Sequence, residues 1–168
     1  LLQQGKPAGA FELYKQIETQ SPDTADEEWW MVLSHLSARL MAAEHYQEAR
    51  HVAQRMAAVA PGDEQRATAK LRQIKCLIEL EQVELAINAM GAVQEENPDN
   101  SAAIPVQFHL ARLLRESGNP LAAAEYFHAL VTSEAPSPEL RYRAAYQRGW
   151  CFSDAGDHRS AREAFSEA

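Results

Sequence analysis

The chain has 168 residues, a formal net charge of −8 and 46% hydrophobic residues. This length predicts one ordinary domain, and the hydrophobic content argues against a disordered chain. The negative charge argues against nucleic-acid binding and against contact with an acidic membrane surface. No apolar run approaches the roughly 18 residues that a membrane span requires, so we predict no direct membrane insertion.

A repeated pattern of small and apolar residues runs along the whole sequence. Five alanines recur at a nearly constant spacing, and each is preceded by a Gly or Glu five positions earlier. A proline follows the first three alanines by twelve positions, and a large apolar residue follows most of the five by four. The anchor alanines of this pattern are Ala10, Ala49, Ala86, Ala123 and Ala161.

Each copy of the pattern predicts a pair of antiparallel helices. Before the turn, apolar residues spaced by three, four and seven positions indicate a first helix. The turn residue, which is Gly118 or Gly156 in the last two copies, marks a place where the chain can adopt positive φ. The alanine then lies where a second helix crosses the first closely, and proline ends the unit because it cannot continue a helix.

This pattern resembles the tetratricopeptide repeat (TPR) family, whose signature is W-x2-L-G-x2-Y followed by Ala, an aromatic residue and Pro. The best match consists of Gly149, Phe152, Gly156, Ala161 and Phe165. The resemblance implies an all-α fold, a TPR-like right-handed α-solenoid of antiparallel helix pairs. The sequence departs from the family at the Trp position and in repeat length, which is about 34 residues in the family. We therefore expect first helices that are extended by about one turn.

We expect a single TPR-like repeat domain over residues 1–168. Both ends fall inside predicted repeats, so we expect a piece of a longer array whose open ends can self-associate. Longer repeats of this kind resemble those of bacterial cell-envelope TPR proteins. The predicted divisions are a partial repeat at 1–22, full repeats at 23–61, 62–98 and 99–136, and a nearly complete repeat at 137–168.

In the TPR family the first helices line a concave groove. Transferred to this sequence, the family's groove positions bring basic and aromatic residues together, although the total charge is negative. Arginine holds carboxylates with two parallel hydrogen bonds and aromatic side chains act as anchors, so we predict that the groove binds an acidic protein or peptide. The alternative is an ordinary solvated helix face with ion pairs between residues i and i+4. The predicted groove residues are Arg72, Lys75, Phe108, Arg112, Arg115, Tyr142, Tyr146 and Trp150.

Histidines and cysteines offer weaker candidates for chemistry. His45, Glu48 and His51 share one predicted helix, but the two histidines diverge too far around it to hold one ion. No H-E-x-x-H or paired C-x-x-C occurs, so we predict no metal site and no cofactor. Cys76 and Cys151 fall at equivalent places two repeats apart, too distant for a disulfide. We interpret both as small structural residues.

Trp29 and Trp30 are adjacent on the first helix of the first full repeat. Neighbouring side chains on a helix diverge by about 100°. We therefore expect one tryptophan to pack inward and the other to be exposed or covered by a partner.

The sequence carries no nucleotide-binding or hydrolase motif, and a repeat surface offers no deep closed pocket for catalysis. We therefore predict that the chain is not an enzyme and is a scaffold for protein–protein interaction. One alternative is a periplasmic TPR segment of a bacterial envelope assembly, secretion or polysaccharide-export system. Another is an oligomerisation module that acts through the repeat ends. The sequence leaves the compartment open between cytoplasm and periplasm.

Overall fold

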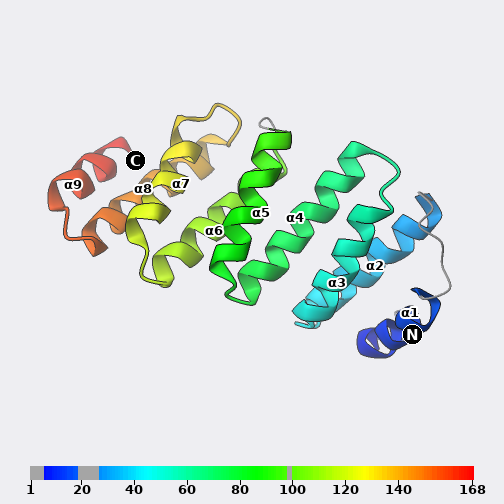
Figure 1. Ribbon diagram of the computed structural model, residues 1–168. Helices are drawn as coiled ribbons and strands as arrows, with labels where there is room; N and C mark the ends of the chain where they lie inside the picture. The colour runs from blue at the N-terminus through cyan, green and yellow to red at the C-terminus, as the bar shows by residue number, and fades with distance from the viewer. Residues whose placement is uncertain (1–5, 19–26, 98–99) are drawn as a thin grey trace. The chain divides into compact units, whose positions relative to one another are not determined.

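The computed structural model describes residues 6–18, 27–97 and 100–168, and these residues form nine α-helices (Figure 1). The chain divides into two compact units, residues 1–82 and 83–168, and each unit is described by itself. No helix in the described part of the chain is long and apolar enough to cross a bilayer.

The first unit contains four of these helices. Within it α3 packs against both α2 and α4, and α1 contacts α2 (Figure 1). In this unit the first helices are extended as predicted, because α2 and α4 have 16 and 17 residues whereas α3 has 13. In the second unit the prediction holds for the first helix at 138–154, with 17 residues, and not for the one at 103–116, with 14. The helices are α1 (Pro7–Glu18), α2 (Glu27–Ala42), α3 (Tyr46–Ala58) and α4 (Asp63–Glu79).

The second unit contains the other five described helices. Here α7 packs against both α6 and α8, α8 packs against α9, and α5 contacts α6 (Figure 1). Pro105 lies in the first turn of α6, where its missing N–H costs no helical hydrogen bond. The helices are α5 (Val83–Glu96), α6 (Ala103–Glu116), α7 (Pro120–Thr132), α8 (Pro138–Asp154) and α9 (His158–Glu167).

The first helices α2, α4, α6 and α8 all end in the same way. After each helix one residue adopts positive φ, and its amide bonds to the carbonyl three residues back. The next amide bonds to the carbonyl five residues back, as Asn119 does to Leu114 at 2.9 Å. This Schellman arrangement satisfies carbonyls that the helix leaves unpaired. The positive-φ residues are the predicted turn positions Glu44, Glu81, Gly118 and Gly156.

The anchor alanines lie in the cores of the two units. Ala49 in the first unit, and Ala86, Ala123 and Ala161 in the second, are all buried. A methyl side chain at these positions lets neighbouring helices approach closely without leaving a void. Ala10 of α1 is half-buried.

Gly149 of α8 allows close packing of α9. A Cβ atom added to Gly149 would lie 2.5 Å from the ring of Phe165 on α9. That ring also lies against α8, because its centre is 5.5 Å from the ring of Tyr146 and 5.7 Å from that of Trp150. The glycine is therefore needed for the close approach of an aromatic ring.

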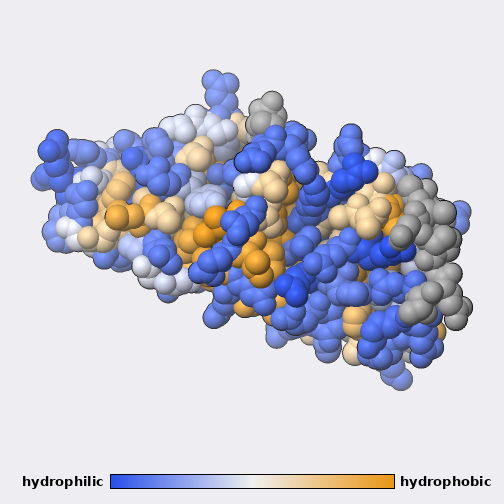
Figure 2. Space-filling model, viewed as in Figure 1, coloured by the Kyte–Doolittle hydropathy of each residue, from blue (hydrophilic) through white to orange (hydrophobic). Residues whose placement is uncertain are grey.

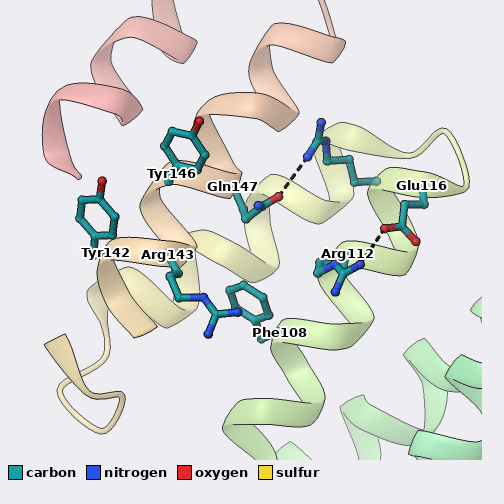
Figure 3. A pocket seen from close by; sticks show the side chains of 8 residues that line it. Phe108, Arg112, Glu116, Tyr142, Arg143, Tyr146 and Gln147 are labelled. Atoms are coloured by element: carbon teal, nitrogen blue, oxygen red, sulfur yellow. Dashed lines mark hydrogen bonds and ion pairs between the residues drawn. The ribbon is translucent and has the colours of Figure 1, made fainter. Parts of the chain in front are cut away.

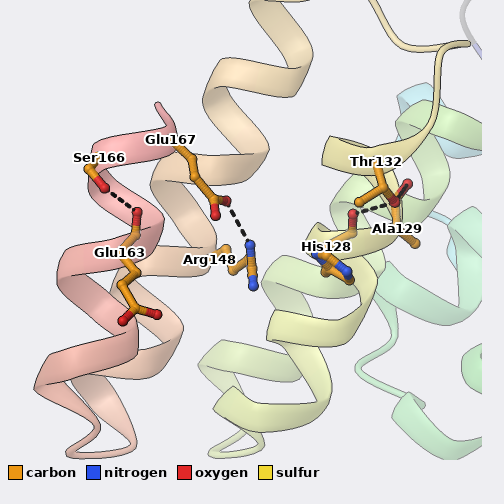
Figure 4. A network of polar contacts seen from close by, with 7 residues as sticks. All are labelled: His128, Ala129, Thr132, Arg148, Glu163, Ser166 and Glu167. Carbon is orange, nitrogen blue, oxygen red and sulfur yellow. Dashed lines mark hydrogen bonds and ion pairs between the residues drawn. The ribbon is translucent and has the colours of Figure 1, made fainter.

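Polar contacts also hold α9 in place (Figure 4). Arg148 of α8 donates a hydrogen bond to Glu167 of α9 at 2.9 Å, and its guanidinium lies 5.4 Å from the centre of the Phe152 ring. At the start of α9, the Asp157 side chain accepts a hydrogen bond from the backbone amide of Ser160 at 3.0 Å. Hydrogen bonds from Ser160 lower the pKa of Asp157, as expected of a carboxylate that caps a helix.

Both tryptophans of α2 pack against the core of the first unit. The prediction that one of them would be exposed or covered by a partner was therefore wrong. The reason is that α2 contacts α1 as well as α3. The ring of Trp29 stacks on Tyr14 of α1 with the ring centres 6.4 Å apart. Two diverging side chains can thus both be half-buried when a helix has neighbours on two sides.

The candidate metal ligands of the first unit have other partners. Tyr14 donates a hydrogen bond to Glu18, whose other carboxylate oxygen lies 3.0 Å from Nε2 of His51. Burial acts to raise the pKa of Glu18, but the hydrogen bonds with Tyr14 and His51 outweigh it and the pKa falls below its usual value. His45 contacts Glu48 instead, at 3.7 Å. Among the residues that the structure describes, no three His, Cys, Asp or Glu side chains are grouped so that they could hold a metal ion.

The viewed face of the molecule is mostly hydrophilic, with apolar residues gathered in smaller patches (Figure 2). In the second unit, three exposed aromatic side chains come from the single helix α8. They are Tyr142, Tyr146 and Trp150, with 55%, 43% and 39% of their surface exposed. Aromatic surface on this helix is therefore available for contact with another molecule.

Candidate functional site

A pocket of about 470 Å³ opens between α6 and α8 in the second unit (Figure 3). Both helices pack against α7, and their side chains form the two sides of the opening. Five of the eight predicted groove residues line it. The lining consists of Phe108, Arg112, Arg115 and Glu116 from α6, and Tyr142, Arg143, Tyr146 and Gln147 from α8.

Aromatic rings form much of the pocket wall. Phe108 is buried, and its ring centre lies 5.3 Å from that of the core residue Phe127. Because Phe108 is fixed by the core, it gives the pocket a rigid apolar surface. Tyr142 and Tyr146 remain exposed, and Tyr146 contacts Trp150 with ring centres 6.2 Å apart. The predicted residue Trp150 thus adjoins the pocket without lining it.

Arg115 is held firmly by groups of α8. Its Nε donates to Asp154 at 2.6 Å, and its Nη1 donates to Oε1 of Gln147 at 3.0 Å (Figure 3). Its guanidinium also lies 5.9 Å from the centre of the Trp150 ring. With a charged partner, a second hydrogen bond and a ring contact, Arg115 has a fixed geometry. Arg115 therefore gives the pocket part of its shape and positive charge, but its bonded N–H groups are not available to a ligand.

Arg112 is held much more loosely. Its ion pair is with Glu116 on the same helix, at 3.2 Å between Nη2 and Oε1 (Figure 3). The two side chains are 49% and 63% exposed. Exposed pairs at i and i+4 stabilise a helix by only about 0.3–0.5 kcal/mol. An incoming anion can therefore replace Glu116 on Arg112 at little energetic cost.

Arg143 is a pocket residue that the sequence analysis missed. Its guanidinium lies 5.1 Å from the centre of the Phe108 ring, and in Figure 3 that ring lies between the side chains of Arg143 and Arg112. The repeat register points to Arg143. The first groove position transferred from the TPR family is Met31 in the first full repeat, and Arg143 precedes Ala161 by the same interval as Met31 precedes Ala49. Tyr142 was assigned to this position instead, one residue too early.

The pocket is positively charged although the chain is acidic. Three arginines and one glutamate line it, which leaves a formal charge of plus two on a chain of net charge −8. Arg115 is engaged by Asp154, whereas no acidic side chain in the described part of the chain forms an ion pair with Arg143. Arg112 and Arg143 are therefore the groups that can donate to an acidic ligand, on either side of the Phe108 ring.

Arg72 and Lys75, the other predicted groove residues, lie on α4 in the first unit. The Nη1 atom of Arg72 donates to the backbone oxygen of Ser34 at 2.6 Å and lies 3.2 Å from its hydroxyl oxygen. Burial lowers the pKa of Arg72. Lys75 is exposed. The guanidinium of Arg72 therefore joins α4 to the backbone of α2, and a role of either residue in binding remains a prediction.

Each unit has one cysteine, and both cysteines are free and fully buried. Burial raises the pKa of Cys76 and of Cys151 to about 11. Very little thiolate forms near neutral pH, and thiolate is the reactive species. In the folded chain both thiols are therefore protected, and reaction at either one reports opening of its own unit.

Comparison with known proteins supports the repeat assignment. Residues 108–168, which contain the whole pocket, match the sequence model of the tetratricopeptide repeat family. No curated protein matches the sequence.

Several solved structures share the fold. MamA matches with a TM-score of 0.70 and 17% identity, over 98% of this chain and 88% of MamA. Nearly identical TPR-like repeats from Podosopora anserina match with a TM-score of 0.67 and 19% identity, over 99% of this chain and 86% of theirs. YrrB, a TPR protein with an unusual peptide-binding site, gives 0.66 and 17%, over 96% of this chain and 76% of YrrB. At these identities the likeness shows the fold, and the predicted all-α, TPR-like class is confirmed.

Proposed function

We propose that this chain, which has a TPR-like fold and carries tetratricopeptide repeats at residues 108–168, is a scaffold that binds an acidic segment of a partner protein. The binding site is the pocket between α6 and α8. The observation that carries this proposal is the pair of arginines, Arg112 and Arg143, on either side of the buried Phe108 ring.

The pocket offers two kinds of contact to one peptide segment. A carboxylate receives charge-assisted hydrogen bonds from Arg112 and Arg143. A neighbouring apolar or aromatic side chain packs on the exposed faces of Tyr142 and Tyr146. The rigid surroundings of Arg115 and Phe108 keep the pocket shaped before the ligand arrives, which reduces the entropy lost on binding. Among proteins with this fold, YrrB has a peptide-binding site, so peptide recognition fits the architecture.

Two dye-labelled, amidated peptides can test this proposal by fluorescence anisotropy. In the Glu-Tyr probe glutamate and tyrosine alternate, and in the Gln-Tyr probe glutamine replaces every glutamate. We expect the chain to bind the Glu-Tyr probe at least about tenfold more tightly than the Gln-Tyr probe, because only the first offers carboxylates to the arginines. Equal affinity for both probes would exclude recognition of an acidic group.

A matched pair of variants locates the binding site. Arg159 on α9 forms an ion pair with Glu163 at i+4 and 3.2 Å, the same spacing and distance as Arg112 with Glu116, and it does not line the pocket. Arg112→Glu and Arg159→Glu therefore change the net charge equally. We expect Arg112→Glu to weaken binding of the Glu-Tyr probe about tenfold or more, and Arg159→Glu to change it less than twofold. Equal losses would show that binding follows net charge and not the pocket.

A further inference from the structure

We propose that Glu116 is a built-in competitor of the acidic ligand: in the free protein its carboxylate occupies Arg112, and the ligand's carboxylate must replace it. This inference rests on the proposed function of the pocket. It assigns Glu116 a role in selectivity, since a ligand gains Arg112 only if it brings a carboxylate of its own.

The position of Glu116 supports this role. Glu116 is the single acidic residue that lines the pocket, and its carboxylate oxygen lies 3.2 Å from Nη2 of Arg112. Figure 3 shows the two side chains joined at one side of the opening. Glu116 therefore presents to Arg112 the same chemical group that an acidic ligand would present.

The contrast with Arg115 shows why exchange occurs at Arg112. Arg115 is bonded to Asp154 at 2.6 Å and to Gln147 at 3.0 Å, and its side chain is 27% exposed. Its partners come from α8, so displacing them would disturb the contact between two helices. The partner of Arg112 comes from its own helix and is mostly exposed. A ligand can displace Glu116 by a side-chain rotation into water, with no change in helix packing.

Exchange of carboxylates on Arg112 has a consequence for selectivity. A neutral ligand that displaced Glu116 would leave Arg112 without an acidic partner, so Arg112 gives it no gain. A ligand with one carboxylate gains the difference between its own contacts and those of Glu116. A ligand carboxylate that also reaches Arg143 forms a second contact with a guanidinium, and Glu116 does not compete for that contact. The pocket thus favours a carboxylate that lies between the two arginines.

The test is the affinity of Glu116→Gln for the Glu-Tyr probe. Glutamine keeps the size of the side chain and removes its charge, so Arg112 becomes free and a like charge leaves the site. Ion pairs and like-charge pairs of this exposed kind each change affinity by small factors, and we expect binding to tighten about threefold. The matched control is Glu163→Gln, which frees Arg159 in the same way on α9. We expect this control to change affinity by less than about 1.5-fold.

A double-mutant cycle shows whether the effect passes through Arg112. In an Arg112→Gln background, we expect Glu116→Gln to lose most of its threefold gain. The proposal is overturned if Glu116→Gln leaves the affinity unchanged or weakens it while the unmodified chain still prefers the Glu-Tyr probe. It is also overturned if the gain persists without Arg112. Failure of the unmodified chain to prefer the Glu-Tyr probe would instead reject the proposed function itself.

Discussion

The two units use the same position of the repeat in different ways. Ser34 of α2 precedes its anchor Ala49 by the same interval as Phe108 of α6 precedes its anchor Ala123. In each unit an arginine from the next first helix contacts this residue. Arg72 donates to the backbone oxygen of Ser34 at 2.6 Å, whereas the guanidinium of Arg143 lies over the Phe108 ring at 5.1 Å.

The two units differ both in the side chain at this position and in the place of the arginine, because Arg72 lies 14 residues before Ala86 whereas Arg143 lies 18 residues before Ala161. Serine is small and leaves its carbonyl oxygen within reach, so Arg72 becomes a half-buried cross-link between α4 and α2. The equivalent residue in the second unit is Phe108, and Arg143 lies on its ring and remains exposed. In these two units the arginine that bonds to the backbone of Ser34 is structural, and the arginine on the Phe108 ring is available for recognition.

The largest expected loss of stability comes from a repeat position that carries a large side chain in the first unit and no side chain in the second. Gly149 precedes Ala161 by the same interval as Ile74 precedes Ala86, and Ile74 is a buried residue of the first unit. In the second unit the ring of Phe165 takes that space. We expect Gly149→Val to lower the free energy of unfolding by about 2–3 kcal/mol, because overpacking displaces the ring and outweighs the slightly better helix propensity of valine relative to glycine. Urea unfolding followed by circular dichroism measures this loss.

A second substitution shows whether the ring is the cause. Phe165→Ala in the Gly149→Val chain makes room for the new side chain, so the double variant should be less unstable than the sum of the two single changes. Labelling of Cys151, which lies in α8, should accelerate in Gly149→Val, while labelling of Cys76 in the first unit should change less. Strict additivity of the two substitutions would show that the space at Gly149 is not filled by Phe165.

The next prediction distinguishes the structural arginine, Arg72, from the recognition arginine, Arg143, by stability and by binding. Arg72→Met removes the two hydrogen bonds to Ser34 and leaves the half-buried oxygens of that residue without their charged donor. We expect a loss of about 2 kcal/mol in the free energy of unfolding. Arg143→Met keeps an apolar chain near Phe108 and should lose less than about 1 kcal/mol. Binding of the Glu-Tyr probe should show the reverse order, with the greater loss for Arg143→Met. If Arg143→Met is the more destabilising change, the distinction between structural and recognition arginines fails.

The fold could be predicted from the sequence because its signals are local and repeated. The anchor Ala123 and the turn residue Gly118 stand a fixed distance apart in the repeat, and the same spacing recurs for Ala49 and Glu44. Such periodic spacing fixes where helices cross and where they end. The structure accordingly buries the alanines and places the turn residues at positive φ.

The details of the candidate site depend on contacts between helices, which spacing alone does not reveal. Arg72 is held against the first unit because it donates to the backbone oxygen of Ser34, a residue on another helix. Glu116 lies outside the groove positions transferred from the TPR family, and its role follows only from its contact with Arg112 in the pocket. The burial of both Trp29 and Trp30 follows from the contact of α2 with α1. The position of a residue in the repeat predicts the helix face on which it lies. The side chains of neighbouring helices determine whether it is buried, bonded or exposed there.

The smallest effect concerns the turns, where the units differ again. Among the residues that the structure describes, both positive-φ residues of the first unit are glutamates, Glu44 and Glu81, and both of the second are glycines. A side chain at positive φ costs roughly 1–2 kcal/mol, and glycine avoids this at the cost of a more flexible unfolded chain. We therefore expect Glu81→Gly to raise the free energy of unfolding by about 1 kcal/mol, and Gly118→Ala to lower it by a similar amount. Urea unfolding of the two variants beside the unmodified chain measures both changes.

A nearby glutamate provides the control for the turns. Glu84 lies in the first turn of α5, and its side chain is exposed. Glycine is unfavourable inside a helix by roughly 0.5–1 kcal/mol, so Glu84→Gly should destabilise the chain although the chemical change is the same as in Glu81→Gly. Because Glu81 follows the C-terminus of α4 and Glu84 lies at the N-terminus of α5, loss of a negative charge alone also acts with opposite signs at the two positions. Glu81→Gln removes the charge but keeps a side chain at positive φ, so it should give little of the gain of Glu81→Gly if backbone conformation controls the result. If both substitutions destabilise the chain, the glutamates at positive φ contribute contacts that outweigh their strain, and the first unit is not improved by the glycine turns of the second.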